Sequence, residues 1–160
     1  MFATADLYDA HEEALQVMQP GFLSFGQKTS FHGPVATVQA LEDNTKVKSM
    51  LSTPGEGRVL VVDGGGSLRC ALVGDNIAQL AIDNGWAGVV VFGCIRDAAV
   101  IDQMDIGIRA LGTNPRKSVK RDGGVTDITL RIAGCVVEPG MHLYSDTDGI
   151  VLSATALSPV

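Results

Sequence analysis

The sequence predicts a single-domain α/β protein whose central sheet is largely parallel. The length of 160 residues suits one compact hydrophobic core. Two continuous apolar runs, at residues 59–62 and 88–92, have the pattern of strands that are buried on both faces. Helical patterns alternate with strands through the middle of the chain, which favours parallel strands joined by right-handed helical crossovers.

The N-terminal third begins with a predicted helix. Thr4 precedes an acidic and alanine-rich stretch, and Pro20 ends the helix because proline cannot continue the hydrogen-bond ladder. A second, amphipathic helix starts at Asp43 or Asn44, either of which can cap its first turn. The elements predicted here are the helix from residue 4 toward 20, a strand at 35–41, the helix at 43–51 and a loop at 52–58.

The middle of the chain has the clearest alternation of strands and helices. The helix predicted at 75–84 places Ile77 and Leu80 on one face, and Gly85 supplies its C-terminal stop. Gly134 separates two short apolar segments and predicts a hairpin. The remaining predictions are strands at 59–62, 68–73, 88–92, 106–111 and 149–152, a short helix at 98–103, an exposed basic loop at 114–124, a hairpin of 128–132 with 135–137, and an acidic turn at 144–148.

The bulk composition excludes several classes of protein. A net charge of −6 disfavours direct nucleic-acid binding, because an acidic chain gains nothing from phosphate, and it suits cations or a basic protein partner. No apolar run approaches the ~20 residues that cross a bilayer, and residues 1–10 lack the apolar core of a signal peptide. Cys70, Cys94 and Cys135 lie far apart among apolar residues, which favours buried reduced thiols over a zinc site. We expect a soluble cytoplasmic protein with no membrane partner.

The first candidate site is the junction from Gly74 to Ile77, where an apolar segment ends and a helix begins. The first N–H groups of a helix have no partner within the helix, and the helix dipole is positive there. Such an end binds a carboxylate or a phosphate, and Gly74 has no side chain to obstruct the ligand. The alternative interpretation is that Asp75 is only the N-cap of the helix.

The second candidate site is Arg96 with Asp97, directly after the buried strand. Ligands of open α/β sheets bind beyond the carboxyl ends of the strands, so both side chains are expected at that edge. Twenty residues separate Asp75 from Arg96, which is enough for one helix and one strand to return the chain to the same edge. We therefore expect these three residues to converge. The alternative is a surface ion pair of Arg96 with Asp97.

The residue types suit the cleavage of a bond beside a 2-oxo group. Asp97 can supply the one carboxylate that Mg²⁺ often takes from a protein. Arg96 offers a planar fork for a carboxylate or an enolate oxygen, and Asp75 can hold or deprotonate a water molecule. The cation and Arg96 would together stabilise an enolate. Magnesium and manganese are not distinguished, because both accept oxygen ligands.

Other motifs do not support competing chemistries. The glycines of residues 63–66 follow a strand but match neither GxGxxG nor a P-loop, so they predict a tight turn that forms one wall of the pocket rather than a methyltransferase site. The histidines have no metal-binding spacing, and the lysines lie in polar stretches, which disfavours a Schiff-base mechanism. The histidines are His11, His32 and His142, and the lysines are Lys28, Lys46, Lys48, Lys117 and Lys120.

Short motifs spread over nearly the whole chain point to a known family. They are residues 24–26 (SFG), 42–44 (EDN), 58–67 (RVLVVDGGGS), 71–75 (ALVGD), 93–97 (GCIRD), 105–111 (DIGIRAL), 112–117 (GTNPRK), 144–146 (YSD) and 148–150 (DGI). In these motifs the chain resembles the RraA-like family, which contains the regulators of ribonuclease activity A and the metal-dependent 4-hydroxy-4-methyl-2-oxoglutarate aldolases. The aldolases are similar in carrying an Asp, twenty residues and then Arg-Asp, which here is Asp75 followed by Arg96 and Asp97.

The resemblance implies a fold, a reaction and a set of ligands. The fold is a swivelling-type α-β-β-α sandwich over residues 1–160, assembled as a homotrimer with sites near subunit interfaces. The reactions are retro-aldol cleavage of 4-hydroxy-4-methyl-2-oxoglutarate to pyruvate and decarboxylation of oxaloacetate, both through a pyruvate enolate. The implied assignments are a divalent cation (Mg or Mn) on Asp97, a catalytic water near Asp75, and the small 2-oxo acid on Arg96 and the backbone of Gly74, Asp75, Asn76 and Ile77.

A regulatory role is the alternative. The chain is short and ends soon after Leu152, whereas the aldolases often carry a C-terminal extension that reaches a neighbouring site. Its general likeness is closer to the regulators, which bind and inhibit ribonuclease E and can lack the acidic residues kept here. The two roles are compatible, because a binding surface and a pocket are separate features.

Overall fold

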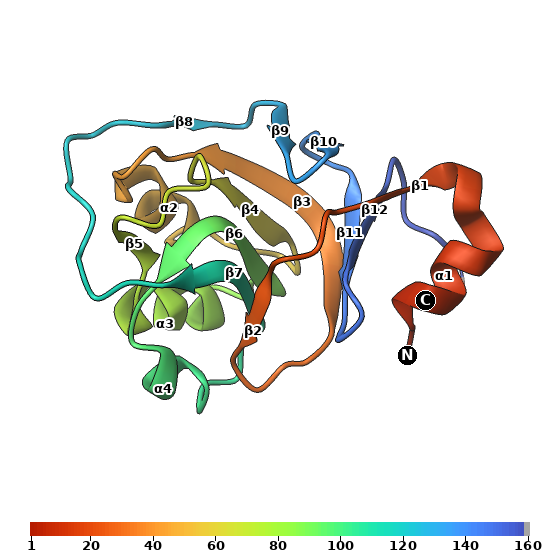
Figure 1. Ribbon diagram of the computed structural model, residues 1–160, viewed down its shortest axis with the longest axis horizontal. Helices are drawn as coiled ribbons and strands as arrows, with labels where there is room; N and C mark the ends of the chain where they lie inside the picture. Colours follow the sequence, from red (N-terminus) through yellow and green to blue (C-terminus); the bar gives the residue numbers. More distant parts are fainter. Residues whose placement is uncertain (159–160) are drawn as a thin grey trace.

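The computed structural model describes residues 1–158 and shows a mixed α/β fold in four layers. In Figure 1, α2, α3 and α4 cover one face of a central sheet, a second group of strands packs on its other face, and α1 lies outside those strands. Two apolar clusters separate the sheets from each other and from the inner helices, and a third lies beneath α1. The order helix, sheet, sheet, helix confirms the predicted α-β-β-α sandwich.

The central sheet is parallel, as the sequence predicts. Strand β4 (Val59–Asp63) lies between β3 (Phe31–Gln39) and β6 (Gly88–Ile95), and all three run in the same direction. Strands β5 (Ala71–Val73) and β7 (Ile108–Thr113) also pair in parallel with β6. The side chains of β4 are buried on both faces except at its last residue, which explains the unbroken apolar run.

The second sheet is antiparallel and shares β3 with the first. Strand β11 (His142–Ser145) pairs with the N-terminal half of β3, and β12 (Ile150–Ser153) pairs with both β11 and β1 (Leu15–Val17). The hairpin of β9 (Leu130–Ile132) and β10 (Cys135–Val137) packs in the same apolar layer. Two short strands complete the edges of the central sheet, β2 (Leu23–Phe25) on β7 and β8 (Val125–Thr126) on β3.

Residues 1–158 contain four α-helices, which form the outer layers. The inner group packs Val47, Ala78 and Ile101 into the large core cluster beneath it. On the opposite side, Leu7 packs against Tyr144 and Val151 of the second sheet. The helices are α1 (Thr4–His11), α2 (Thr45–Leu51), α3 (Asp75–Asp83) and α4 (Ala98–Ile101), and a 3-10 turn, η1, spans Glu12–Ala14.

The prediction of one helix from Thr4 toward Pro20 is wrong beyond His11. Glu12 and Glu13 would lie at the negative end of the helix dipole, which disfavours continuing the helix there. Residues 15–17 instead gain β-ladder hydrogen bonds from β12. The acidic turn predicted at 144–148 is also displaced, because Tyr144 and Ser145 complete β11 and the turn begins after them.

The predicted cysteine environment is confirmed. Cys70, Cys94 and Cys135 are free thiols and each is at most 5% exposed. Burial raises the pKa of all three thiols, so they stay protonated and behave as small apolar side chains. Within residues 1–158, no helix is both long and apolar enough to cross a membrane.

Candidate functional site

The parallel pairing of β5 with β6 brings the two candidate segments together. Val73 is the register partner of Ile95, so Gly74 and Arg96 leave the sheet side by side at the carboxyl ends of their strands. The Arg96 N–H donates to the Val73 carbonyl at 2.9 Å, which extends this pairing by one bond. The convergence expected from the spacing of Asp75, Arg96 and Asp97 is therefore present in the fold.

Asp97 places its carboxylate against the first turn of α3. Its Oδ2 atom accepts a hydrogen bond from the Asp75 N–H at 3.1 Å. Its backbone has φ 60°, in the left-handed region that is costly for most residues other than glycine but that Asp and Asn tolerate better than others. This conformation turns the side chain back toward α3 at the point where α4 begins. Within the described chain, the other carboxylate oxygen, Oδ1, accepts no hydrogen bond and remains available.

Gly74 is required by this close approach. A Cβ atom at Gly74 would lie 2.8 Å from Asp97 Oδ2 and 3.6 Å from Arg96 Nε. The interpretation of Asp75 as the N-cap is wrong, because Gly74 is the N-cap and Asp75 is the first helical residue. The Asp75 carboxylate accepts the N–H of Asn76 at 2.8 Å. The N-terminal N–H groups of α3 thus contact two carboxylates, one of them from Asp97 at the start of α4.

A cavity of about 150 Å³ opens over these residues. Its wall includes Asn44 and Ser118, which are 9% and 6% exposed. The Asn44 Oδ1 and Ser118 Oγ atoms are buried without a hydrogen-bond partner among the described residues, whereas the Asn44 amide donates to the Leu72 carbonyl at 3.2 Å. A buried polar atom without a partner is costly, so a ligand that reaches both atoms would gain from satisfying them.

The basic segment at 114–124 also lines the cavity. Lys117 and Lys120 line it together with Lys48 of α2. The segment is held in place by Asp43, whose Oδ2 atom accepts N–H bonds from Arg121 at 2.8 Å and Gly123 at 3.0 Å. Sequence reasoning treated this segment only as an exposed loop and missed its place beside the site.

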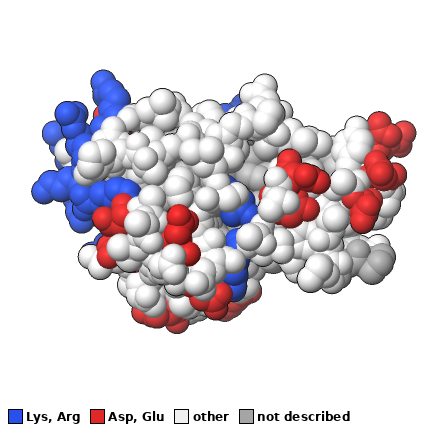
Figure 2. Space-filling model, turned by 60° about the horizontal axis from the view of Figure 1, so that its bottom comes forward, with Lys and Arg blue, Asp and Glu red and all other residues white. Residues whose placement is uncertain are grey.

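Positive charge outweighs negative charge around the cavity. Its lining carries the side chains of Arg96 and three lysines against those of Asp75 and Asp97. Figure 2 shows that lysine and arginine side chains gather at one end of the molecule, at the left of the view. This balance disfavours a bare cation and favours a cation that arrives with an anion carrying more than one negative charge. A small dicarboxylate meets that requirement.

The donor set fits a hard divalent cation bound through few protein ligands. Within the described part of the chain, no group of three or more His, Cys, Asp or Glu side chains is placed to enclose a metal. Magnesium commonly takes one or two carboxylates and keeps water and substrate oxygens in its other positions. Asp97, with one uncommitted carboxylate oxygen beside the cavity, can serve as that ligand.

The glycine turn after β4 has no free amides for a phosphate or a cofactor. The N–H groups of Gly64 and Gly66 both donate to the Phe92 carbonyl at 3.1 Å, and that of Gly65 donates to Asp63 Oδ1 at 2.8 Å. Nucleotide-binding turns instead leave such amides free for the ligand. The turn is therefore structural, and its hydrogen bonds tie the end of β4 to β6. None of residues 63–66 lines the cavity, so the prediction that the turn forms one wall of the pocket is wrong.

We expect Gly74→Ala to lower the activity of this site about tenfold to 100-fold, because a displaced carboxylate misplaces the ligand. The backbone at Gly74 is extended, with φ −119°, so alanine introduces no backbone strain and acts only through its Cβ atom. Gly112→Ala is the matched control, because a Cβ there would lie 3.7 Å from the nearest atom, the Cys94 sulfur. Equal activity of the two variants, measured at equal thermal stability, would show that the Gly74 contact is unimportant.

The fold and the strand-edge cavity define an α/β protein with a small polar candidate site next to a helix N-terminus. The chain belongs to the RraA-like family, whose model, described as Aldolase/RraA, matches residues 4–152. It is 54% identical over 154 residues to a protein of Alkalilimnicola ehrlichii named "Putative 4-hydroxy-4-methyl-2-oxoglutarate aldolase", with 96% of each chain covered. A protein of Arabidopsis thaliana named "Putative 4-hydroxy-4-methyl-2-oxoglutarate aldolase 3" is 48% identical over 162 residues, and the alignment covers 98% of each chain.

Two solved structures superpose on this fold with a TM-score of 0.96. One, from Geobacillus kaustophilus, is described as an S-adenosylmethionine: 2-dimethylmenaquinone methyltransferase; it is 48% identical, with 98% of this chain and 97% of that chain covered. The other is described as the RNA-processing inhibitor RraA from Thermus thermophilis; it is 42% identical, with 100% of this chain and 97% of that chain covered. In the present chain the turn most suited to a nucleotide-like cofactor has its amides occupied, as described above.

Proposed function

We propose that this protein is a divalent-metal-dependent lyase that cleaves 4-hydroxy-4-methyl-2-oxoglutarate to pyruvate and also decarboxylates oxaloacetate. The observation that carries the proposal is the placement of the Asp97 carboxylate 3.1 Å from the Asp75 N–H, with Arg96 beside it at the start of α3. Relatives at about half identity that are named as aldolases support the lyase class.

Substrate binding uses the positive groups around the cavity. Arg96 binds the carboxylate or the 2-oxo oxygen of the substrate, because its planar fork can donate two parallel hydrogen bonds. The backbone of residues 74–77 adds the positive end of the α3 dipole. Lys117 and Lys120, which also line the cavity, suit the second carboxylate of a dicarboxylic acid.

Cleavage begins with removal of a proton from the 4-hydroxyl group of the substrate. Asp75 orients the water molecule that takes this proton. The hydroxyl oxygen then forms a carbonyl with C4 as the bond between C3 and C4 breaks. The electron pair of that bond moves to C3 and gives the enolate of pyruvate. A proton added to that enolate at carbon completes the first pyruvate, and the other fragment is a second pyruvate. Arg96 stabilises the negative charge that develops on the enolate oxygen.

Decarboxylation of oxaloacetate reaches the same enolate by loss of CO₂ from C4. The two reactions therefore share every group that acts on the pyruvyl half of the substrate. A divalent cation, magnesium or manganese, held through Asp97 would supply Lewis-acid polarisation of the 2-oxo group.

The decisive assay measures pyruvate release from oxaloacetate with Mg²⁺, with and without a chelator. We expect turnover above the uncatalysed rate, its loss with the chelator, and its recovery on adding excess Mg²⁺ or Mn²⁺. The same assay with 4-hydroxy-4-methyl-2-oxoglutarate should release two pyruvates per substrate consumed. Absence of metal-dependent turnover on both substrates would remove the enzymatic proposal.

A regulatory role is the second candidate. It is supported by the structural relative described as an RNA-processing inhibitor and by the net charge of −6, which suits a basic protein partner. The chain would then bind and inhibit ribonuclease E without direct contact with RNA. Inhibition of ribonuclease E by a preparation that releases no pyruvate would place regulation ahead of catalysis.

We also propose that the chain forms a homotrimer and acts in the cytoplasm. Exposed apolar side chains next to the basic segment support self-association near the site. They are Leu41, Val119 and Val125, which are 62%, 45% and 48% exposed.

A further inference from the structure

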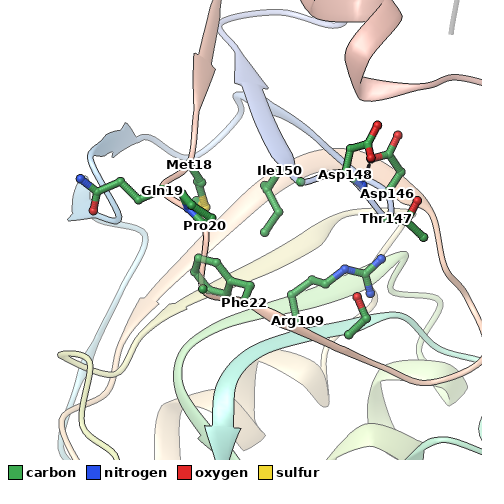
Figure 3. A pocket seen from close by; sticks show the side chains of 12 residues that line it. Met18, Gln19, Pro20, Phe22, Arg109, Asp146, Thr147, Asp148 and Ile150 are labelled. Carbon is green, nitrogen blue, oxygen red and sulfur yellow. Dashed lines mark hydrogen bonds between the residues drawn. The ribbon is translucent and has the colours of Figure 1, made fainter.

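A second cavity, of about 270 Å³, lies away from the candidate active site and contains a buried arginine (Figure 3). Arg109 lies on β7, pairs with Ser24 of β2 and is only 2% exposed. The cavity is bounded by two segments that are distant in the sequence, residues 18–22 and residues 146–150. None of these residues takes part in the proposed lyase reaction.

The Arg109 guanidinium has few partners. Its two terminal nitrogens donate to the Thr29 carbonyl at 2.6 Å and to the Ile108 carbonyl at 3.3 Å, and its Nε atom is buried with no partner in the described part of the chain. The ring of Phe31 lies 4.9 Å from the guanidinium carbon. A guanidinium has five N–H donors, so these two carbonyls leave most of its donor capacity unused.

Among the residues that the structure describes, Arg109 also has no counter-ion within 4.0 Å. Within residues 1–158, the ion pairs closer than 4.0 Å are Lys46 with Asp122 and Arg69 with Glu42, and neither involves Arg109. Burial lowers the pKa of Arg109, and the field of Asp146 offsets this only in part. A buried unpaired charge is strongly unfavourable, so proteins normally pair such a charge or hydrogen-bond it fully.

The nearby acidic side chains do not neutralise Arg109. The Asp146 carboxylate accepts hydrogen bonds from the Thr4 N–H and hydroxyl, each at 2.7 Å, and from the Asp148 N–H at 2.9 Å. Asp148 itself is exposed. Figure 3 shows both carboxylates directed away from the guanidinium. The cavity therefore presents a cation on one side and apolar side chains on the other, namely Met18, Phe22 and Ile150.

We propose that this cavity binds a small carboxylate with an apolar tail, with Arg109 as the group that recognises the anion. The carboxylate would receive paired hydrogen bonds from the guanidinium, and the tail would pack on Met18, Phe22 and Ile150. A free carboxylic acid and an acidic group from a second copy of the chain offer the same chemistry. The site is independent of the proposed lyase reaction.

The test measures the thermal unfolding midpoint and calorimetric binding with acetate and hexanoate at matched ionic strength. We expect hexanoate to stabilise the wild-type protein and to bind about tenfold or more tightly than acetate, because its longer tail buries more apolar surface. Arg109→Met keeps a long apolar side chain and should lose this binding by at least tenfold. If hexanoate stabilises the wild type and Arg109→Met to the same measurable extent, the proposal is overturned.

A second pair of variants decides the question even if Arg109→Met does not fold. Ser24 is exposed and is the register partner of Arg109, so Ser24→Glu would supply an internal carboxylate beside the guanidinium. We expect Ser24→Glu to unfold at a higher temperature than the matched control Ser24→Gln and to lose its response to hexanoate, while Ser24→Gln keeps it. The reverse order of stability would contradict the proposal.

Light scattering on the same proteins distinguishes the two sources of the carboxylate. If a second copy supplies it, the wild type is an oligomer that does not bind hexanoate, and Arg109→Met or Ser24→Glu dissociates it. Failure to bind hexanoate, together with an oligomeric state that neither variant changes, would refute both forms of the proposal. Pyruvate release measured in parallel separates this outcome from a failure of the lyase proposal.

Discussion

Asp97→Asn is expected to lower kcat/KM for metal-dependent pyruvate release by at least about 100-fold while leaving the fold intact. Asparagine has the same shape and tolerates the left-handed backbone found at this position, but it lacks the charge that holds a hard cation. Because Asp97 is exposed, the substitution leaves no buried group without a partner. The measurements are steady-state kinetics, Mn²⁺ affinity and the thermal unfolding midpoint.

Asp83→Asn is the matched control for this result. Asp83 is an exposed aspartate at the other end of α3, where it accepts a hydrogen bond from Gln79 at 2.8 Å. Its neutralisation should change neither turnover nor Mn²⁺ affinity. If Asp97→Asn keeps wild-type turnover and Mn²⁺ affinity, Asp97 is not the metal ligand, and its carboxylate serves only to cap α3.

Arg96→Ala is expected to lower kcat about 100-fold with much less effect on Mn²⁺ affinity, since Arg96 stabilises the charge of the enolate and does not hold the metal. The guanidinium is exposed and donates one long hydrogen bond, 3.4 Å, to the Pro115 carbonyl, so its loss should not unfold the protein. Arg96→Lys should recover only part of the rate, because lysine keeps the charge but not the planar fork.

The control for Arg96 is Arg131→Ala, which removes an exposed arginine of β9 that does not line the cavity. It should leave turnover and Mn²⁺ affinity at wild-type values. A rate for Arg96→Ala that matches this control would exclude Arg96 from the reaction, whereas a parallel loss of Mn²⁺ affinity would show that it acts mainly in binding.

The parallel core could be predicted from the sequence because its signals are local. The unbroken apolar runs of β4 and β6 and the glycine stop at Gly85, just after α3, are each contained within a few residues. Strands β1 and β2 were missed, since three residues are too few to show an alternating pattern. Their pairing partners are far away in the chain, so only the tertiary fold makes them strands.

The candidate site could be predicted only in part, for a similar reason. Asp75 and Arg96 follow directly from the strand order, whereas Asn44 and Ser118 enter the cavity through loops whose paths no periodicity reveals. Arg109 did leave a signal, since it interrupts an apolar strand, and a charge at such a position indicates either an edge or a buried function.

The contact between His32 and His142 could not be predicted from the sequence either. His32 and His142 have no metal-binding spacing, yet β3 and β11 pair so that their ring nitrogens lie 2.9 Å apart. Burial and the charge of His32 lower the pKa of His142, which favours the neutral form of the His142 ring at physiological pH. The antiparallel register that produces this contact joins residues more than a hundred positions apart.

The hydrogen bonds from Arg121 and Gly123 to the Asp43 carboxylate hold the basic segment in place. The pKa of Asp43 therefore determines the pH at which this segment is released from the site. Burial alone would raise the pKa of Asp43, but hydrogen bonds from Thr45, Arg121 and Gly123 hold it well below its ordinary value. A lowered carboxyl pKa contributes stability that is complete above the unfolded-state value and is lost only as pH falls toward the folded-state value. Near neutral pH the Asp43 carboxylate thus stays ionised, and the segment that carries Lys117 and Lys120 stays in place. Changes of the reaction rate with pH in this range then report the protonation of the reacting groups and not a loss of structure in this segment.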